Sequence, residues 1–169
     1  QYSRRNLELV ETLRDRKTQG SLLWVLDRTV TAAGGRLLKK WLEQPLRHQA
    51  GIEDRLEKVE VFFNRHRIRE ATRVLLRRTY DLQRLLAKLA CGTANPRDLV
   101  ALSATLTVLP ELRAELYREE LGPVAALAAE INLLPQLSAL LVTALREDPP
   151  FSVTEGNIFR EGYHQELDE

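Results

Sequence analysis

The sequence has no methionine, a single cysteine and no long apolar run, and each absence excludes a class of protein. Cys91 has no partner within the chain for a disulfide, which fits a reducing, cytosolic setting. No stretch approaches the roughly 18 consecutive apolar residues that a membrane-spanning helix needs. The polar, basic start lacks the apolar segment of a secretory signal peptide. With 44% apolar residues, the chain is expected to be globular rather than disordered.

The two ends of the sequence also lack signals that a complete small protein would carry. There is no methionine to start translation, and the last residues, 167–169, favour a helix without a glycine, asparagine or proline to end it. We therefore expect the 169 residues to be a segment of a larger protein.

Residues with the pattern of a catalytic or metal site are also missing. His48, His66 and His164 have no second histidine or cysteine at metal-ligand spacing, so each is expected at the surface or at a helix cap. Cys91 lies among leucines and is expected to be a buried, unreactive thiol. Residues 34–40 (GGRLLKK) lack the full phosphate-loop pattern and are better explained as a helix start that a neighbouring segment approaches closely. The sequence therefore predicts no catalytic, cofactor-binding or metal-binding residue, and no enzyme.

Helical spacing dominates the apolar pattern that is present. Four stripes recur every three or four residues, which places each on one face of a helix. The stripes comprise Ile52, Leu56, Val59 and Phe62; Leu82, Leu85, Leu86 and Leu89; Leu99, Leu102, Leu106 and Leu109; and Leu137, Leu140, Leu141 and Leu145. Helices with one apolar face must pack on one another, so we expect these leucine stripes to form the core.

Residues that begin or end helices lie between the stripes. Thr31 is expected to cap a helix that Pro45 ends, and Gly92 is expected to follow the end of another. Asn95 and Pro96 are expected to begin the next helix, as N-cap and first helical residue. Three further prolines are expected to cut the remainder into short helices: Pro110, Pro123 and Pro135.

Two segments depart from helical spacing. Residues 22–26 are apolar on every side, which leaves a buried helical turn and a buried strand as alternatives. Residues 151–159 form two short alternating runs around a glycine, which predicts a small β-hairpin. From residue 163 the sequence becomes helical again. The predicted fold is all-α: a single domain over residues 1–169, built as an irregular multi-helix bundle with one small hairpin near 151–159.

The net charge of +1 conceals an uneven distribution along the chain. Residues 1–90 contain 20 Lys and Arg against 11 Asp and Glu, whereas residues 91–169 contain 5 against 13. The densest basic stretch comprises Arg65, Arg67, Arg69, Arg73, Arg77, Arg78, Arg84 and Lys88. The first five arginines are candidate phosphate contacts. A solvated helix face, or salt bridges to the acidic half, is favoured instead, because no aromatic residues or groove-reading motif accompany the charges.

Five blocks of sequence, in order along the chain, carry a family pattern. They read SRRNLEL at 3–9, SLLWVLDRTVT at 21–31, GRLLKKWLEQPL at 35–46, DLQRLLAKL with NPRDL at 81–99, and EGYHQELD at 161–168. Together they resemble the core domain of the MutS DNA mismatch-repair proteins and cover essentially the whole chain. The residues that carry the likeness are Arg5, Asn6, Leu7, Glu8, Leu26, Asp27, Trp41, Leu42, Pro45, Asp81, Leu82, Pro96, Arg97, Asp98, Gly162, Tyr163, Leu167 and Asp168.

This resemblance implies a place within a larger machine. In the family a connector domain precedes this region, and a lever helix, here beginning at about residues 163–169, continues into a DNA clamp. The parent proteins are dimers that encircle DNA, read mismatches with an N-terminal domain and hydrolyse ATP with magnesium in a C-terminal domain. The motifs of those two domains are absent from this chain.

The expected function is therefore a structural and allosteric core that relays the ATP state to the clamp and supports DNA binding by the full-length protein. The expected partners are the other domains of the parent chain, a second copy of the parent, the encircled DNA and a MutL-like protein, in the bacterial cytoplasm at the nucleoid. Two alternatives remain open: a helical module that binds DNA non-specifically through its basic half, and a helical protein–protein interaction domain.

Overall fold

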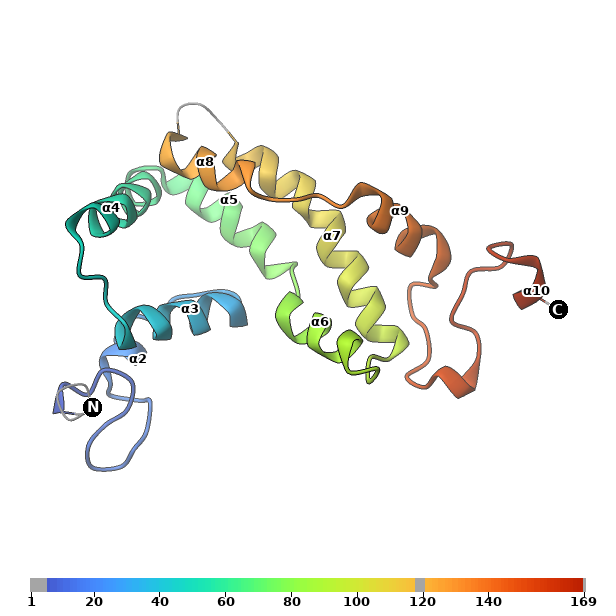
Figure 1. Ribbon diagram of the computed structural model, residues 1–169, viewed down its shortest axis with the longest axis horizontal. Coiled ribbons are helices and arrows are strands. Elements are labelled where there is room, and N and C mark those ends of the chain that lie inside the picture. Colours follow the sequence, from blue (N-terminus) through green and yellow to red (C-terminus); the bar gives the residue numbers. More distant parts are fainter. Residues whose placement is uncertain (1–5, 118–120, 169) are drawn as a thin grey trace. The chain divides into compact units, whose positions relative to one another are not determined.

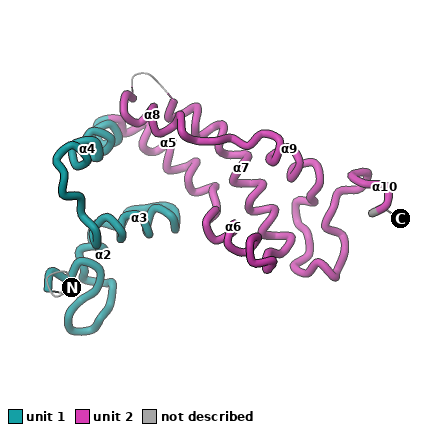
Figure 2. Tube along the Cα trace, in the orientation of Figure 1, with its two compact units in different colours: residues 1–64 teal, residues 65–169 magenta. Residues whose placement is uncertain are grey.

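A computed structural model describes residues 6–117 and 121–168, with the side chains of 167 and 168 left out. These residues form helices and no strand, which confirms the predicted all-α class. The chain folds into two compact units, residues 1–64 and 65–169 (Figure 2). The assignment of the whole chain to one domain stays a prediction.

In residues 6–64, which the structure describes, the first unit contains α2 (Leu22–Leu26), α3 (Ala32–Glu43) and α4 (Gln49–Asn64). Residues 22–26 are thus a helical turn, whose N-cap Ser21 is buried and accepts a hydrogen bond from the Trp24 amide. Thr31 caps α3 by accepting from the Gly34 amide at 3.0 Å, and α3 ends before Pro45, as predicted.

The prediction that the apolar stripe on α4 forms part of the core is wrong for this unit. Ile52, Leu56 and Val59 are exposed, and α4 contains no buried residue among those described. The spacing of these residues is helical, but periodicity shows only which residues share a face. It does not show that another element of the same unit covers that face.

The second unit is organised around one long helix, α7 (Pro96–Leu116), shown in Figure 1. Four helices pack against it: α5 (His66–Arg77), α6 (Leu82–Ala90), α8 (Pro123–Ala129) and α9 (Pro135–Ala144). A 3-10 turn, η2 (Val153–Glu155), and a last helix, α10 (Gln165–Asp168), follow. Gly92, with φ +67°, follows the end of α6 as predicted, and Pro123 and Pro135 begin α8 and α9.

Buried side chains of the described residues form clusters between the helices of the second unit. The larger joins α6, α7 and α9 and comprises Leu85, Leu102, Leu106, Leu141 and Leu145. The smaller joins α5 and α7 and comprises Leu75, Val108 and Leu112. The predicted core was too broad, because Leu86 is 56% exposed while Leu85 is 6% exposed. In the last stripe, Leu137 and Leu140 are likewise exposed, whereas Leu141 and Leu145 are buried.

Pro110 does not end a helix, contrary to the prediction from sequence, because α7 continues through it. A proline inside a helix removes one backbone hydrogen bond and costs about 3 kcal/mol or more. The helix nevertheless buries Val108 on one side of the proline and Leu112 on the other. Each such burial contributes roughly 1.5–3 kcal/mol, which offsets the loss.

The predicted hairpin at 151–159 is also wrong. Ser152 and Glu155 form a capping box: the Ser152 hydroxyl accepts from the Thr154 amide, and Glu155 accepts from the Ser152 amide at 3.0 Å. This pairing begins a helical turn where the first strand was expected. The second run, around residue 159, instead pairs with the chain that leaves α9 (Figure 1).

Candidate functional site at the base of the C-terminal helix

The segment that leads from α9 to α10 is tied to the end of α9 by one antiparallel bridge, between Leu145 and Phe159. The Arg146 amide donates to the Ile158 carbonyl at 3.0 Å, and the Arg160 amide donates to the Ala144 carbonyl at 2.8 Å. These bonds bring residues fourteen apart into register. They fix where the chain departs toward α10.

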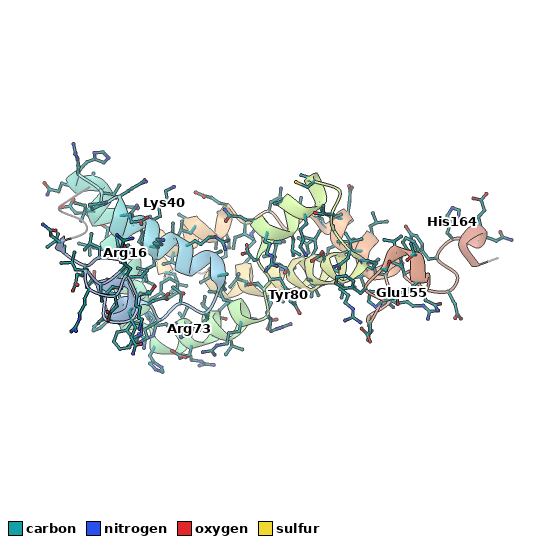
Figure 3. The ribbon with its side chains drawn as sticks, turned by 90° about the horizontal axis from the view of Figure 1, so that it is seen from below. Arg16, Lys40, Arg73, Tyr80, Glu155 and His164 are labelled. Carbon is teal, nitrogen blue, oxygen red and sulfur yellow. The ribbon has the colours of Figure 1, made fainter. Side chains whose placement is uncertain are left out.

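Apolar contacts secure the same segment from both ends. Ile158 packs against the leucine cluster of α6, α7 and α9. Phe159 stacks on Tyr163, with ring centroids 5.7 Å apart and an interplanar angle of 13°. The Tyr163 amide also donates to the Arg160 carbonyl at 3.2 Å, so the chain turns just before α10 begins. His164 extends from this turn at the C-terminal end (Figure 3) and is exposed, as predicted.

A second joint lies at the N-terminus of α7, where three polar residues act together. The Asn95 side chain accepts from the Asp98 amide at 2.9 Å, and Asp98 accepts from the Asn95 amide at 3.0 Å, which completes a capping box. Lys88, on the last turn of α6, donates to both oxygens of Asp98 at 2.7 and 2.8 Å. The hydrogen bond from Lys88, followed by that from the Asn95 backbone, lowers the pKa of Asp98. The joint therefore links the end of α6 to the start of α7.

Arg97 extends this joint to the loop after α9. Its Nε donates to the Pro149 carbonyl at 3.1 Å, and its Nη2 lies 3.5 Å from an Asp148 carboxylate oxygen. Pro149 is buried. The loop that leads into the C-terminal segment is consequently held at two places, by Arg97 on α7 and by the bridge at Leu145.

The five candidate phosphate-contacting arginines fall on α5 and its N-cap. Arg65, Arg67 and Arg77 are exposed, whereas Arg69 and Arg73 lie 3.6 and 4.0 Å from Glu70. Figure 3 labels Arg73 among the side chains of this helix. Salt bridges to the acidic half occur at Arg78, which bonds Glu111 at 2.8 Å, and at Lys88. Phosphate contact by the five arginines stays a prediction.

Cys91 lies at the C-cap of α6 and is exposed, so the expectation of a buried thiol is wrong. The leucine stripe ends at Leu89 and α6 ends at Ala90, so Cys91 lies beyond the buried face of the helix. Across residues 6–117 and 121–168, no three His, Cys, Asp or Glu side chains gather closely enough to hold a metal ion. In the same residues, no helix combines the length and apolar character that crossing a bilayer requires.

Comparison with known proteins identifies the family. The model of the family described as MutS domain III matches residues 2–168. The chain belongs to this family.

Similar proteins of known name belong to the same family. The DNA mismatch repair protein MutS of Geobacillus thermodenitrificans is 46% identical over 99% of this chain, and that of Oceanobacillus iheyensis is 43% identical over 99%. The MutS of Acetivibrio thermocellus is 44% identical over 98% of the chain. The chain spans only 18–19% of the length of these relatives.

Within this MutS domain III chain, several residues of the family blocks lie where one element meets another. Glu8 accepts through its carbonyl from the Leu22 amide at 3.0 Å, which ties the first block to α2. Trp41 on α3 lies under the Arg55 guanidinium of α4, 4.0 Å from the ring centroid. Asp81 caps α6. Arg5 and the side chains of Leu167 and Asp168 lie outside the described residues.

Asp27 shows how one such block works. Its Oδ1 accepts from the Thr29 amide at 2.9 Å and from the Thr29 hydroxyl at 2.7 Å. The hydroxyl bond, followed by the amide bond, lowers the pKa of Asp27. A side chain at Gly34 would approach the Thr31 hydroxyl at 3.0 Å and Thr29 at 3.3 Å. Gly34 and Gly35 therefore let residues 27–31 approach the start of α3 closely, as the sequence predicted.

The contacts that hold the C-terminal segment to the end of α9 were not predicted from the sequence. Arg146 and Arg160 gave no signal, because an arginine that bonds a distant backbone carbonyl looks like any surface arginine in sequence. The one available sign was the recurrence of an apolar residue followed by Arg and Glu, at 145–147 and 159–161.

Proposed function

We propose that this chain is the relay core of a mismatch-repair protein: a stiff helical body that connects the nucleotide state of the parent to its grip on DNA. The supporting observation is the attachment of the C-terminal segment, which is bridged to the end of α9 and packed by Ile158 on the leucine cluster. A helix that continues from α10 would inherit its direction from this attachment.

Coupling between distant sites requires an element with discrete arrangements that both sites bias. Packed helices satisfy that requirement, because interdigitated side chains resist gradual deformation. In this proposal the cluster of α6, α7 and α9 moves as one body. The bridged segment carries its rotation into the continuing helix.

The surrounding assembly is proposed on the strength of family membership. The parent acts as a homodimer that encircles mismatched DNA, hydrolyses ATP with magnesium outside this chain and engages a MutL-like protein. It works in the bacterial cytoplasm at the nucleoid. Within this chain we assign no catalytic, cofactor-binding or metal-binding residue; its residues hold and orient other parts of the parent.

An insertion in the full-length protein tests the relay. Two glycines placed after Glu169 should loosen the coupling between ATP binding and release of the protein from a mismatch, because each glycine costs a helix about 1 kcal/mol and adds a swivel. ATP hydrolysis without DNA should remain near the unmodified rate. Sliding on end-blocked mismatched DNA and DNA-free ATP turnover are measured together.

Two alanines at the same place serve as the control, because they add the same length while preserving helix propensity. The relay predicts a larger loss of ATP-triggered sliding for the glycine insertion than for the alanine insertion. Equal sliding by the glycine variant and the unmodified protein, with the helix shown to be disrupted, contradicts the proposal.

The exposed arginines of α5 favour a second candidate, direct contact with DNA phosphates. Arg65, Arg67 and Arg77 carry no carboxylate partner within 4.0 Å among the described residues. Binding through these residues would be strongly salt-dependent and blind to mismatches, because phosphate contacts carry no sequence information. A clear preference for mismatched duplex by the 169-residue chain would refute this candidate. A concentration-dependent dimer of the same chain would instead favour a protein–protein interaction domain.

A further inference from the structure

The two chain segments that meet at the Leu145–Phe159 bridge have the same short sequence pattern. One reads Leu-Arg-Glu at 145–147 and the other Phe-Arg-Glu at 159–161. Because the bridge is antiparallel, each arginine faces the backbone of the opposite segment and each glutamate lies within reach of the opposite arginine. The arrangement is reciprocal about the bridge.

The contacts of Arg146 and Arg160 follow this reciprocity. Arg146 Nε donates to the Phe159 carbonyl at 3.0 Å, and its Nη2 bonds Glu161 at 3.0 Å. In the opposite direction, Arg160 Nε donates to the Leu145 carbonyl at 2.7 Å, and its Nη2 lies 3.8 Å from Glu147. Each guanidinium thus spans one backbone carbonyl and one carboxylate of the other segment.

We propose that Arg146 and Arg160 form a reciprocal clasp and are the positioning residues that set the direction of the C-terminal helix. This inference rests on the proposed relay, because a defined direction matters when the helix transmits a movement. The chain otherwise offers few anchors there: Ile158 is the residue of this segment that packs on the leucine cluster, and Phe159 and Tyr163 are each more than a third exposed.

The carbonyl bonds, rather than the ion pairs, provide the holding strength. The side chains of Glu161 and Glu147 are 89% and 94% exposed, and ion pairs at such positions contribute little. The planar guanidinium presents Nε and Nη2 in a fixed fork, so one side chain reaches both partners. A lysine retains the charge but has a single nitrogen, and it loses this geometry.

Hydrogen exchange in the full-length protein tests the clasp. Replacing either arginine by methionine, in Arg146→Met or Arg160→Met, keeps an apolar stem and removes the fork. Exchange in peptides covering 144–147 and 158–161 should become about tenfold faster. Arg146→Lys and Arg160→Lys should give a smaller acceleration in the same peptides. Glu161→Gln should change exchange less than about twofold, because its ion pair is exposed.

Glu111→Gln is the matched control, because it breaks the exposed bond to Arg78 on α5 and leaves the bridge intact. Exchange in α7 peptides reports whether the rest of the unit stays folded. If a methionine variant also speeds exchange in α7, the lysine variants are used to judge whether the clasp holds the bridge. Arginine variants that exchange within about twofold of the unmodified protein would overturn the clasp, as would an equal effect of Glu111→Gln.

The same variants separate the clasp from the relay. ATP-triggered sliding is measured on the proteins whose exchange has been determined. Faster exchange with impaired sliding supports both ideas. Faster exchange with normal sliding supports the clasp as a structural joint and contradicts its role in positioning the relay helix.

Discussion

Two buried threonines in the second unit have opposite hydrogen-bonding circumstances. Thr105, on α7, accepts from the Tyr80 amide at 3.0 Å and donates to the Ala101 carbonyl at 2.9 Å, and it is 1% exposed. Thr72, on α5, buries its hydroxyl without a hydrogen-bond partner among the described residues. Burying a polar group lowers the stability of the folded protein when the group has no hydrogen-bond partner, and costs little when it has one.

The threonines therefore predict opposite effects of the same substitution. Thr105→Val should lower the free energy of unfolding by about 1–3 kcal/mol, because the Tyr80 amide loses its acceptor. Thr72→Val should be neutral or stabilising by up to about 1 kcal/mol, because it removes an unpaired hydroxyl. Urea unfolding of the 169-residue chain measures both. A stabilising Thr105→Val would show that the segment between α5 and α6, which contains Tyr80, does not depend on its bond to α7.

Asp98 predicts a specific dependence of stability on pH. Its folded-state pKa is lowered by the Lys88 bond, so its contribution is complete above the unfolded pKa of about 3.9 and is lost as pH falls through the folded pKa. Asp98→Asn should cost about 0.5–2 kcal/mol at pH 7. The difference between the two proteins should shrink below about pH 4, in urea midpoints taken from pH 7 to 3. A difference that stays constant over this range would exclude the ionised carboxylate as its source.

At the scale of elements, helix starts and ends were predictable because single residues determine them. Thr31, Asn95 and Gly92 act on neighbours a few residues away, and each works where the sequence placed it. The hairpin and the break at Pro110 could not be predicted in the same way. Both depended on which distant segment pairs or packs, and a local pattern carries no information about that choice.

In the candidate site, too, contacts between neighbouring residues could be predicted and contacts between distant segments could not. The start of α7 was predicted from Asn95 and Pro96, but the bond from Lys88 to Asp98 joins residues ten apart and emerges only in the fold. The pairing of Leu145 with Phe159 replaced the predicted hairpin for a similar reason. The capping box at Ser152 competes with a local strand, and the leucine cluster receives Ile158.

Two adjacent residues on α6 test the assignment of its buried face. Leu85 lies in the leucine cluster and Leu86 faces solvent, although both belong to one predicted stripe. Leu85→Ala should cost about 2–5 kcal/mol. Leu86→Ala should change stability by less than about 0.5 kcal/mol, as expected for a surface position. Urea midpoints of the two variants decide the register; a larger loss at Leu86 would reverse it.

At the scale of the whole molecule, most of the candidate phosphate-contacting arginines and the contacts that hold the C-terminal segment lie on different elements. The basic residues concentrate on α5, while the joints lie at the N-terminus of α7 and at the base of α10. Phosphate contact and relay are therefore separable: substitutions on α5 should alter salt dependence, and substitutions at the base of α10 should alter coupling.

The central claim is that the base of the C-terminal helix stays joined to the leucine cluster of α6, α7 and α9 in every nucleotide state of the parent, so that the two move as one body. Hydrogen exchange in the full-length protein on mismatched DNA, with ATP and then with ADP, measures this directly. The relay predicts that residues 158–168 and the peptides of α7 stay protected with both nucleotides, because the joined segments move together. Loss of protection in residues 158–168 in one nucleotide state, with α7 still protected and the nucleotide shown to be bound, would contradict it.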